Sequence, residues 1–401
     1  MDLRQLHLVD YRNFGDATIE FGPKFSILHG PNGAGKTNIL EAIYLVSTLR
    51  SFRLPSLRAL IAKNCRQARI EIRGVEQVTG VATTLTVGLE QHGTTTRRTT
   101  QADGKPIRKA TEFYGRVPTI LFTPEDLNVL RGGPAARRQL LDRALFAVQP
   151  RHIIDIRGYE KVMRSRNRLL KDARSGVRAP QFVMLVDTYE RQLAAFGARV
   201  WARRVEFLNL LAPEVELAFA EIHGPTPCEL AYVSRLADPG HDQREACLVS
   251  ALERSRNADI ARGSTTVGPH LDDFNVMLER QLAAEFASQG QTRSLVLAIK
   301  IAELRAAARL RGYKPLLLLD DVSSELDRPR TEKFFEALTR EAGQCLVTTT
   351  AANYVPIGSS VERLDIRVDS GRIYGSSATG VQAYNASAPA EPFTPPVSTV
   401  S

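Results

Sequence analysis

The residues best suited to chemistry are the eight from Gly30 to Thr37, which read Gly-Pro-Asn-Gly-Ala-Gly-Lys-Thr. They fill every fixed position of G-x-x-x-x-G-K-[ST], the phosphate-binding P-loop. Glycines let such a loop fold tightly around an anion, and the helix that follows points its positive end at the same anion. Lys36 would reach the β- and γ-phosphates of a nucleotide, and the Thr37 hydroxyl would hold Mg²⁺. The expected nucleotide contacts are Gly30, Pro31, Asn32, Gly33, Ala34, Gly35, Lys36, Thr37 and Asn38.

The segments on either side of this loop support the same interpretation. Residues 25–29 form an apolar run that suits a buried strand, and residues 38–45 carry apolar side chains at helical spacing. A strand, a glycine-rich turn and a helix are the context that the motif requires. The alternative, a glycine-rich turn that binds no nucleotide, is the weaker interpretation because the motif and its flanks are complete.

Two acidic residues, Asp320 and Asp321, follow four leucines at residues 316–319. Such a run predicts a central parallel strand, and ligands of open α/β sheets bind beyond the carboxyl ends of such strands. In this Walker B pattern Asp320 would hold Mg²⁺, while Asp321 would orient the attacking water or accept its proton. An acidic pair that only caps neighbouring helices is the alternative.

A third motif, Ser288-Gln289-Gly290-Gln291, precedes a strong helical pattern that ends near Gly312. Ser288 fits the N-cap of this helix. The same turn also presents a hydroxyl, an open backbone and a positive helix end to an anion, so both interpretations stay open. The acidic pair is followed by the loop residues Ser324, Glu325, Leu326 and Asp327, and then by a buried strand at residues 344–350.

The first 123 residues carry the elements that would hold the P-loop. Strands are expected at residues 3–11, 17–21 and 25–29. A helix follows over residues 37–49. Residues 68–123 read as an all-β stretch with alternating Thr, Val and Ile, and Asp103-Gly104 is a hairpin signal. This stretch could lie beside the nucleotide.

Helical periodicity dominates residues 124–262, which predicts a helical arm. Helices at residues 151–172 and 182–211, joined by a segment with Gly and Pro, would form an αα-hairpin. On the first helix, five cations spaced by four, three, four and three residues share one face. They are Arg157, Lys161, Arg164, Arg168 and Lys171. This row is either a solvated helix face or a contact for nucleic-acid phosphates, and the absence of an anion from the row favours the second.

The net charge of the chain, formally +9, is concentrated in the same region. Residues 131–210 hold 17 Lys and Arg against 7 Asp and Glu, so the rest of the chain is close to neutral. We therefore expect the arm to meet a polyanionic partner.

The cysteines and the apolar runs indicate the compartment. Cys65, Cys228, Cys247 and Cys345 are scattered, which favours neither a disulfide framework nor a zinc site. The longest aliphatic run has four residues, far short of a membrane span, and the first residues lack the pattern of a signal peptide. A cytoplasmic protein without membrane contact is expected.

Strand character resumes at residues 265–274, where His270, Asp272 and Asp273 could imitate a metal site. Neighbouring residues of a strand point to opposite faces of the sheet. We therefore expect a strand here and no metal centre.

The order of the P-loop, the Ser-x-Gly-Gln turn, the Asp-Asp strand and the Ser-Glu-Leu-Asp loop resembles an ABC-type ATPase head. The resemblance implies an α/β fold, in which a mixed sheet is flanked by helices and carries an inserted helical arm domain. In that family the Ser-x-Gly-Gln signature acts on ATP held by another subunit, so a homodimer should form on ATP and be released by hydrolysis. Transporter members usually have Glu at the position of Asp321, and a His where this chain has Thr349 or a neighbour. The candidate catalytic residues are thus Asp321, Lys36 and Thr349, and the shorter Asp321 is consistent with slow hydrolysis.

The spacing of the motifs distinguishes relatives within that family, since 251 positions separate Thr37 from Ser288. Transporter subunits have a much shorter insert there, and SMC proteins have far longer coiled coils. An intermediate insert with a short helical arm resembles the RecF family of bacterial recombination mediators. The stretches that carry this resemblance are residues 8–14, 29–43, 122–127, 137–142, 268–273, 288–291 and 318–327.

Resemblance to RecF implies binding of double-stranded DNA that depends on ATP and prefers junctions of duplex with single strand. It implies RecR as a partner, with RecO and RecA in the same pathway, and a role in DNA replication, recombination, repair and the SOS response. It also implies a weak ATPase that DNA stimulates, with ATP and Mg²⁺ as cofactors.

The expected plan has four parts. Residues 1–123 and 263–375 make the two halves of the head, residues 124–262 make the arm, and residues 376–401, rich in Ala, Ser and Pro, make a disordered tail. Two other functions compete with this interpretation. An ATPase subunit of a membrane transporter would not need a basic arm of this length. A non-catalytic DNA-binding protein would not need Lys36, Thr37 and both acids.

Overall fold

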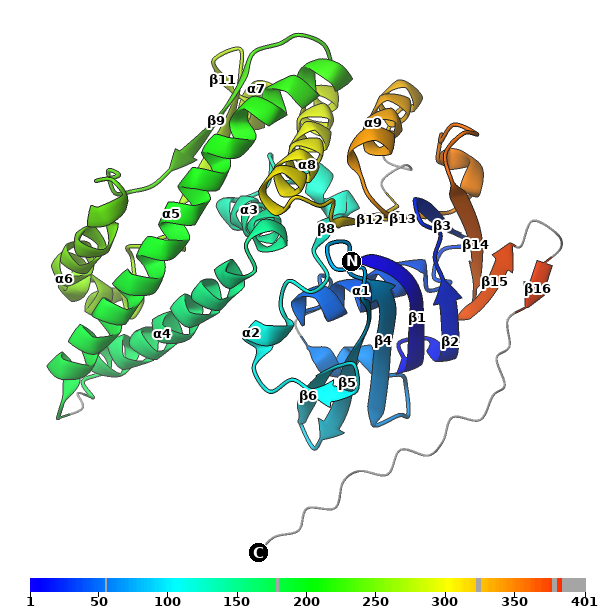
Figure 1. Ribbon diagram of the computed structural model, residues 1–401. Helices are drawn as coiled ribbons and strands as arrows, with labels where there is room; N and C mark the ends of the chain where they lie inside the picture. Colours follow the sequence, from blue (N-terminus) through cyan, green and yellow to red (C-terminus); the bar gives the residue numbers. More distant parts are fainter. Residues whose placement is uncertain (55, 178–179, 322–325, 377–380, 384–401) are drawn as a thin grey trace, which may run out of the picture.

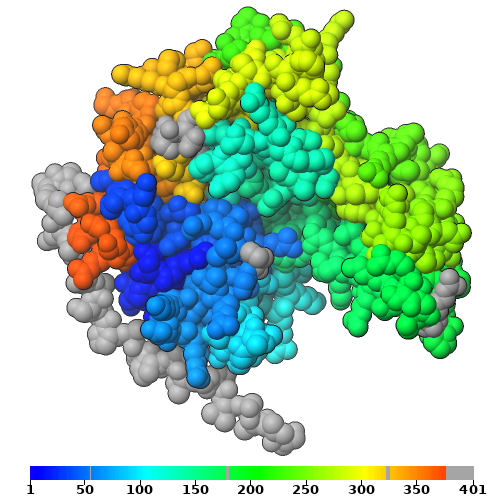
Figure 2. Space-filling model, turned by 180° about the vertical axis from the view of Figure 1, so that it is seen from behind, coloured from blue at the N-terminus to red at the C-terminus, as the bar shows by residue number. Residues whose placement is uncertain are grey.

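The computed structural model describes residues 1–401 except 55, 178–179, 322–325, 377–380 and 384–401. These described residues form a head and a helical arm that stands out from it (Figure 1). Both ends of the sequence build the head, and its middle builds the arm (Figure 2). Ser324, Glu325 and most of the predicted tail lie outside the described residues.

The centre of the head is a sheet with the strand order β16-β15-β14-β3-β13-β12-β8. The five strands from β14 to β8 are parallel to their neighbours, whereas β15 and β16 are antiparallel. Both faces are covered, which is why the inner strands are continuous apolar runs. The strands are β3 (Phe25–His29), β8 (Thr119–Phe122), β12 (Leu316–Asp320), β13 (Cys345–Thr349), β14 (Arg363–Asp369), β15 (Arg372–Ser376) and β16 (Val381–Ala383).

Strand β16 corrects the predicted tail. Its three residues pair antiparallel with β15, and Ala383 lies opposite Tyr374. An edge strand such as β15 presents unpaired N–H and C=O groups, which a following segment can pair even when its own composition is poor in strand formers. The prediction of disorder from residue 376 onward was therefore wrong for Val381–Ala383.

A second sheet in the head is antiparallel, with the order β2-β1-β4-β5-β6-β7. The predicted hairpin at Asp103-Gly104 is confirmed, since both residues have positive φ between β6 and β7. The prediction that residues 68–123 are all β was wrong at Ala110–Phe113, which form the short helix α2. The last strand of the stretch, β8, leaves this sheet and joins the parallel one. Its four consecutive buried residues suit a sheet that is covered on both faces. The strands are β1 (Asp2–Tyr11), β2 (Phe14–Glu20), β4 (Gln67–Val75), β5 (Ala82–His92), β6 (Thr95–Ala102) and β7 (Lys105–Pro106).

Helix α1 (Lys36–Thr48) lies between the two sheets and contacts strands of both. It is therefore buried on nearly every side, and its apolar residues join one core with the inner faces of both sheets. The helix ends one residue before the predicted Leu49, which adopts a left-handed conformation as its C-cap.

The other face of the parallel sheet is covered by helices, which form a second core with it. Their packing fixes the motifs of the C-terminal half to the sheet. These helices are α3 (Pro134–Val148), α8 (Gln289–Arg311), α9 (Arg328–Glu341) and the head end of α5. The predicted C-cap Gly312 is confirmed, with φ of 73° at the end of α8.

The arm is the predicted αα-hairpin with a third helix packed against it. Helix α4 (Arg151–Arg174) and helix α5 (Phe182–Ile222) run side by side, and α6 (Arg244–Arg262) packs on both. Helix α5 is eleven residues longer than predicted and passes through Pro213. Its last turns bury apolar side chains against α8, and this packing outweighs the hydrogen bond that proline removes.

A short antiparallel sheet of β9 (Cys228–Val233), β10 (Asp273–Leu278) and β11 (Gln281–Leu282) joins the arm to the head. Strand β9 lies within residues 124–262, where helical periodicity dominates and no strand was predicted. It pairs with β10, which is far away in the chain, so the local sequence does not reveal the partner that stabilises it.

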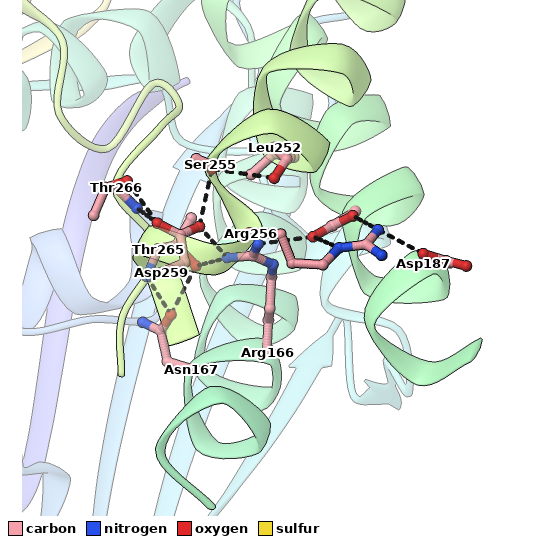
Figure 3. A network of polar contacts seen from close by, with 10 residues as sticks. Arg166, Asn167, Asp187, Leu252, Ser255, Arg256, Asp259, Thr265 and Thr266 are labelled. Carbon is pink, nitrogen blue, oxygen red and sulfur yellow. Dashed lines mark hydrogen bonds and ion pairs between the residues drawn. The ribbon is translucent and has the colours of Figure 1, made fainter. Parts of the chain in front are cut away.

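The arm is held together by a buried network of charges around Arg166 (Figure 3). Arg166 of α4 donates hydrogen bonds to Glu190 of α5 at 2.8 Å and to Asp259 of α6 at 2.7 Å. All three side chains are almost completely buried. Arg256 adds a second cation that contacts Glu190 and Asp187. A buried charge is costly without its partners, so this network fixes the three helices in one arrangement.

The remaining helical segments are short: η1 (Leu57–Leu60), α2 (Ala110–Phe113), η2 (Pro124–Asn128), η3 (His241–Gln243), α7 (Ala283–Phe286) and η5 (Ala352–Tyr354). In the described part of the chain, no helix has the length and apolar character needed to cross a membrane.

Candidate nucleotide site and basic arm

The P-loop joins the end of β3 to the start of α1, as the motif predicts. Gly30 and Gly35 have φ of 145° and 114°, in the region that favours glycine. A side chain at Gly30 would lie 2.1 Å from the carbonyl oxygen of Val368, so the neighbouring strand also excludes any other residue. The loop is thus wrapped tightly enough for its backbone N–H groups to surround an anion.

The ammonium of Lys36 lies inside this loop. Its Nζ donates hydrogen bonds to the carbonyl oxygens of Gly30 at 2.7 Å and Pro31 at 2.9 Å. Burial lowers the pKa of Lys36, and the nearby Asp321 and Asp320 raise it in part. Within the described residues, the hydrogen bonds of this partly desolvated cation go to carbonyl oxygens, so it is ready to bind phosphate oxygens, which carry a full charge.

Asn13, which sequence reasoning missed, braces the loop from outside. Its Nδ2 donates to the carbonyl oxygen of Ala34 at 2.9 Å, and its Oδ1 accepts from Nδ2 of Asn38 at 2.8 Å. It follows β1, and the turn Arg12-Asn13-Phe14-Gly15 was its only signal in the sequence. The contact arises from the packing of two strands that are not neighbours of the loop in the chain.

The acidic pair lies at the carboxyl end of β12, next to the start of α1. Thr37 Oγ1 donates to Asp320 Oδ1 at 2.7 Å, although 283 residues separate the two. Burial raises the pKa of Asp320, and the hydrogen bonds from Thr37 and Thr348 lower it in part. A hydroxyl and a carboxylate in contact are oxygen ligands of the kind that Mg²⁺ prefers, so the residues present fit this ion.

Asp321 turns the chain sharply away from β12. Its φ is 45°, a left-handed conformation that Asp tolerates better than most residues. Its N–H donates to Thr348 Oγ1 at 2.9 Å. Its charge acts on Lys36, which places both beside the P-loop. The predicted pair therefore faces the loop together.

Thr348 of β13 makes a hydrogen bond to each residue of the acidic pair. Its hydroxyl donates to Asp320 Oδ1 at 2.8 Å and accepts from the N–H of Asp321, and its side chain is fully buried. The predicted candidate, Thr349, points to the other side of the strand, and its hydroxyl donates to the carbonyl oxygen of Ala351 at 3.3 Å. The structure thus brings the neighbour of Thr349, rather than Thr349 itself, to the acidic pair.

We expect Thr348→Val to raise the Mg²⁺ concentration needed for ATP binding about tenfold, as loss of an outer-shell partner typically does. Without this hydroxyl the pKa of Asp320, already raised by burial, rises further, so Mg²⁺-dependent binding is lost at a higher pH as the pH falls. Titrations of nucleotide binding against Mg²⁺ at several pH values measure both shifts. Thr348→Ser keeps the hydroxyl and should behave as the wild type; a valine variant with unchanged Mg²⁺ dependence would contradict this role.

Glu125 is a second residue that sequence reasoning missed at this edge. It lies in η2, directly after β8, and its charge raises the pKa of Asp320, after the larger effect of burial. The sequence marked Thr123-Pro124-Glu125-Asp126 only as a boundary. Had β8 been predicted as a strand of the parallel sheet, Glu125 would have been placed at the carboxyl edge of that sheet, where ligands bind. Residues 119–122 were instead included in the all-β stretch 68–123.

The Ser288–Gln291 turn begins α8, and Ser288 is its N-cap. Ser288 Oγ accepts from the N–H of Gln291 at 3.2 Å, and Gln291 Oε1 accepts from the N–H of Ser288 at 2.8 Å. This capping box confirms the structural interpretation of the motif. Ser288 and Gln289 are exposed, and among the described residues no hydrogen bond joins this turn to the P-loop of the same molecule.

Two residues of the predicted loop after β12 are described. Asp327 is the N-cap of α9 and accepts from the N–H of Arg330 at 3.0 Å. Leu326 packs against the core under the helices. Ser324 and Glu325 lie outside the described residues.

Four of the five cations predicted to share one face of α4 are exposed: Lys161, Arg164, Arg168 and Lys171. Arg157 departs from the row, because it lies where the helix meets the head. Its guanidinium lies 5.0 Å from the ring centroid of Tyr114 and donates to the carbonyl oxygen of Thr48 at 3.4 Å. Helical spacing predicts which residues share a face of α4, but it does not predict which part of that face packs against the head. The row is also not free of anions, since Glu160 lies 4.0 Å from Arg164.

The predicted strand at residues 265–274 begins only at Asp273, because side chains of the arm bind the backbone before it. The N–H of Thr266 donates to Asp259, and Gly268 has φ of 128°. The three candidate metal ligands have separate partners: His270 contacts Tyr159, Asp272 contacts Tyr232 and Ser234, and Asp273 contacts Arg137. Within the described residues no group of three or more His, Cys, Asp or Glu side chains could hold a metal ion.

Comparisons with known proteins cover nearly the whole chain. The family model described as "RecF/RecN/SMC N terminal domain" matches residues 2–367. The chain is 34% identical over 377 residues to the DNA replication and repair protein RecF of Geobacter metallireducens, covering 93% of this chain and 99% of the relative. It is 36% identical over 384 residues to the protein of the same name from Myxococcus xanthus, covering 93% and 97%.

Solved structures give the same result. The chain superposes on the recombination mediator protein RecF-ATP of the RecFOR pathway with a TM-score of 0.81 and 27% identity, over 94% of this chain and 97% of that one. It is similar to the Smc head bound to the C-winged helix domain of ScpA with a TM-score of 0.53, covering 96% and 98%, and the 14% identity there shows the fold alone. The predicted fold, an ABC-type ATPase head of mixed sheets flanked by helices, is confirmed.

Proposed function

The chain belongs to the RecF family of DNA replication and repair proteins, and we propose that it is an ATP-dependent clamp on double-stranded DNA. ATP binds at the P-loop, closes two copies of the head over the nucleotide, and thereby holds DNA between their arms. Hydrolysis is slow and ends the clamped state. The observation that carries this proposal is the exposed Ser288 turn, which makes no hydrogen bond within the described residues to the P-loop of its own molecule.

For the nucleotide, Lys36 would bind the β- and γ-phosphates, with the backbone of residues 30–38 around them. Thr37 and Asp320 would hold Mg²⁺, which neutralises charge on the phosphates. Asp321 would orient the attacking water or take its proton, and Thr348 would keep the carboxylate of Asp320 and the backbone of Asp321 in place. The similarity to the solved RecF-ATP structure supports ATP as the nucleotide.

The role of Thr349 as a catalytic residue stays a prediction. Its side chain is fully buried and directed away from Asp320, so we place the catalytic polar contact of this strand at Thr348. A weak ATPase stimulated by DNA remains part of the proposal.

For DNA, the exposed row Lys161, Arg164, Arg168 and Lys171 would contact backbone phosphates. Reversing all four charges to Glu should weaken duplex binding and reduce the slope of log K against log salt by about three to four, since each lost phosphate contact contributes about 0.9. Fluorescence anisotropy over a salt series measures this slope.

A single pair of variants controls for net charge. Arg168→Glu and Arg254→Glu change the charge of the chain equally, and both side chains are exposed on helices of the arm. Only Arg168→Glu should lose affinity. Equal losses in the two variants, or an unaltered salt slope in the fourfold variant, would return the row to an ordinary solvated face.

In the cell, the proposed clamp acts at junctions of duplex with single strand, together with RecR, and with RecO and RecA in the pathway. It would help load RecA during recombination and repair, support replication restart and the SOS response, and work in the cytoplasm. The relatives' names support the repair role, and the name RecFOR supports the mediator context. Family membership leaves the alternative, an ATPase subunit of a transporter, without an observation in its favour.

Sedimentation with and without ATP and duplex DNA tests the proposal directly. ATP should convert monomers to dimers, and duplex should sediment only with the dimer. Duplex bound equally well by monomers without ATP would contradict the clamp.

A further inference from the structure

The face of the head that looks toward the arm contains a cleft of about 970 Å³. Its walls are the end of α1 with the loop that follows, helix α3, the start of α4, and the middle of α5, with Arg98 of β6 and the turn at Pro269 and His270 completing the lining. Figure 2 shows the molecule hollowed between the head, in blue, and the arm, in green. We call this the head–arm cleft.

The head–arm cleft is strongly basic, because seven arginines and two carboxylates line it. Both carboxylates are already engaged. Asp142 binds Arg204 at 2.7 Å, and Glu160 lies 3.7 Å from Arg50. For Arg98 and Arg157, no carboxylate lies within ion-pair distance in the part of the chain that the structure describes. The positive charge of the cleft is therefore not balanced from within.

Three of these arginines gather around the C-terminal end of α1. Arg98 donates to the carbonyl oxygen of Leu49 at 2.6 Å, Arg157 donates to that of Thr48, and Arg50 follows directly in the chain. Burial, then Arg50 and Arg98, lowers the pKa of Arg157 to about 10. Glu160 is the carboxylate that acts on this cluster among the lining residues, and one carboxylate does not balance three arginines, so the cluster suits a further anion.

Arg157 lies about one helical turn before the exposed row of cations on α4. The row continues outward through Lys161, Arg164 and Arg168, so the cluster and the row form one track. From Arg157 to Lys171 the helix rises by about 21 Å, which matches roughly six base pairs of duplex. A track of this length fits a polymer of phosphates better than a single phosphorylated metabolite.

We propose that the head–arm cleft is a binding site for the sugar–phosphate backbone of nucleic acid, in which Arg50, Arg98 and Arg157 bind phosphate groups. This inference rests on the proposed function for the identity of the polymer, and it adds the head as a second wall of the DNA site. The bound backbone touches the last turn of α1, the helix whose first turn carries Lys36 and Thr37.

The test uses the full chain with Arg98→Glu, Arg157→Glu and the control Arg235→Glu, an exposed arginine outside the cleft. Binding of a 20-base-pair duplex is measured by anisotropy over a salt series with ATP present. Each cleft variant should lose affinity at least tenfold and lower the salt slope by about one, while the control stays near the wild type. Arg98→Ala and Arg157→Ala are tested in the same way, and the unfolding midpoint of every variant is measured. Loss of DNA binding in a variant that unfolds at the wild-type midpoint is then not caused by loss of fold.

Two outcomes would overturn the inference. Folded cleft variants that bind duplex as tightly as the wild type, with the same slope, would exclude the cleft from the DNA site. Variants that lose binding of inorganic tripolyphosphate but keep duplex would assign the cleft to a small anion. Failure of the proposed function is distinct from both, because the wild type itself would then not bind duplex, or the fourfold variant of the exposed row would bind it normally.

Discussion

Lys36→Ala should reduce ATP affinity about a hundredfold and abolish ATP-dependent dimers. Lys36 Nζ is partly desolvated inside the P-loop, and its hydrogen bonds within the described part of the chain go to the carbonyl oxygens of Gly30 and Pro31. Hydrogen bonds to charged groups contribute about 1.5–3 kcal/mol each, so loss of the ammonium removes about 3 kcal/mol, or two orders of magnitude. Calorimetric titration with ATP measures the affinity, and light scattering measures the dimers.

The control for Lys36→Ala is Lys63→Ala, which removes an exposed lysine from the head. It should bind ATP and dimerise as the wild type does. The unfolding midpoint of Lys36→Ala should stay close to the wild type, since the lysine makes no ion pair in the described residues. Dimers that form normally in Lys36→Ala would refute a model in which ATP joins the heads.

Ser288→Arg should block dimers while the monomer still binds ATP. The side chain of Ser288 is exposed at the start of α8, where a long cation would project from the surface that would meet the second head in the proposed dimer. Loss of the cap costs about 1 kcal/mol in helix stability, which is small beside loss of the interface. ATP titration of the monomer and sedimentation with ATP give the two measurements.

A matched control for Ser288→Arg places the same residue at Ser360. This exposed serine precedes β14, at the amino edge of the parallel sheet and so opposite to the nucleotide. Ser360→Arg should dimerise normally. If Ser288→Arg instead lost ATP binding as a monomer, Ser288 would belong to the nucleotide site of its own molecule.

The parts of the site that sequence reasoning could predict are local or follow from sheet topology. The P-loop carries its conformation in its glycines, as Gly30 and Gly35 show. Thr37 and Asp320 are far apart in the chain, yet both lie beyond carboxyl ends of parallel strands, which made their contact predictable.

Other parts depend on which elements become neighbours, and no local pattern encodes that. Thr348 contacts Asp320 and Asp321 because β13 lies between β3 and β12 in the sheet. The sequence of β13 does not indicate this order of strands. Arg166 lies on the inner face of α4 because Asp259, 93 residues away, binds it there. Arg157 left the exposed row for the same reason, since the head covers only the first turns of that helix.

In the proposed clamp, helix α5 would act as a lever. It reaches from the far end of the arm to the signature helix α8, and Pro213 removes one backbone hydrogen bond along it. The part of α5 from Phe182 to Pro213 is about 45 Å long. A tilt of about 5° at Pro213 would move the tip of the arm by about 4 Å, close to the spacing of successive base pairs. If the arm binds DNA as proposed, a small adjustment at the ATP face would therefore change which phosphates the arm contacts.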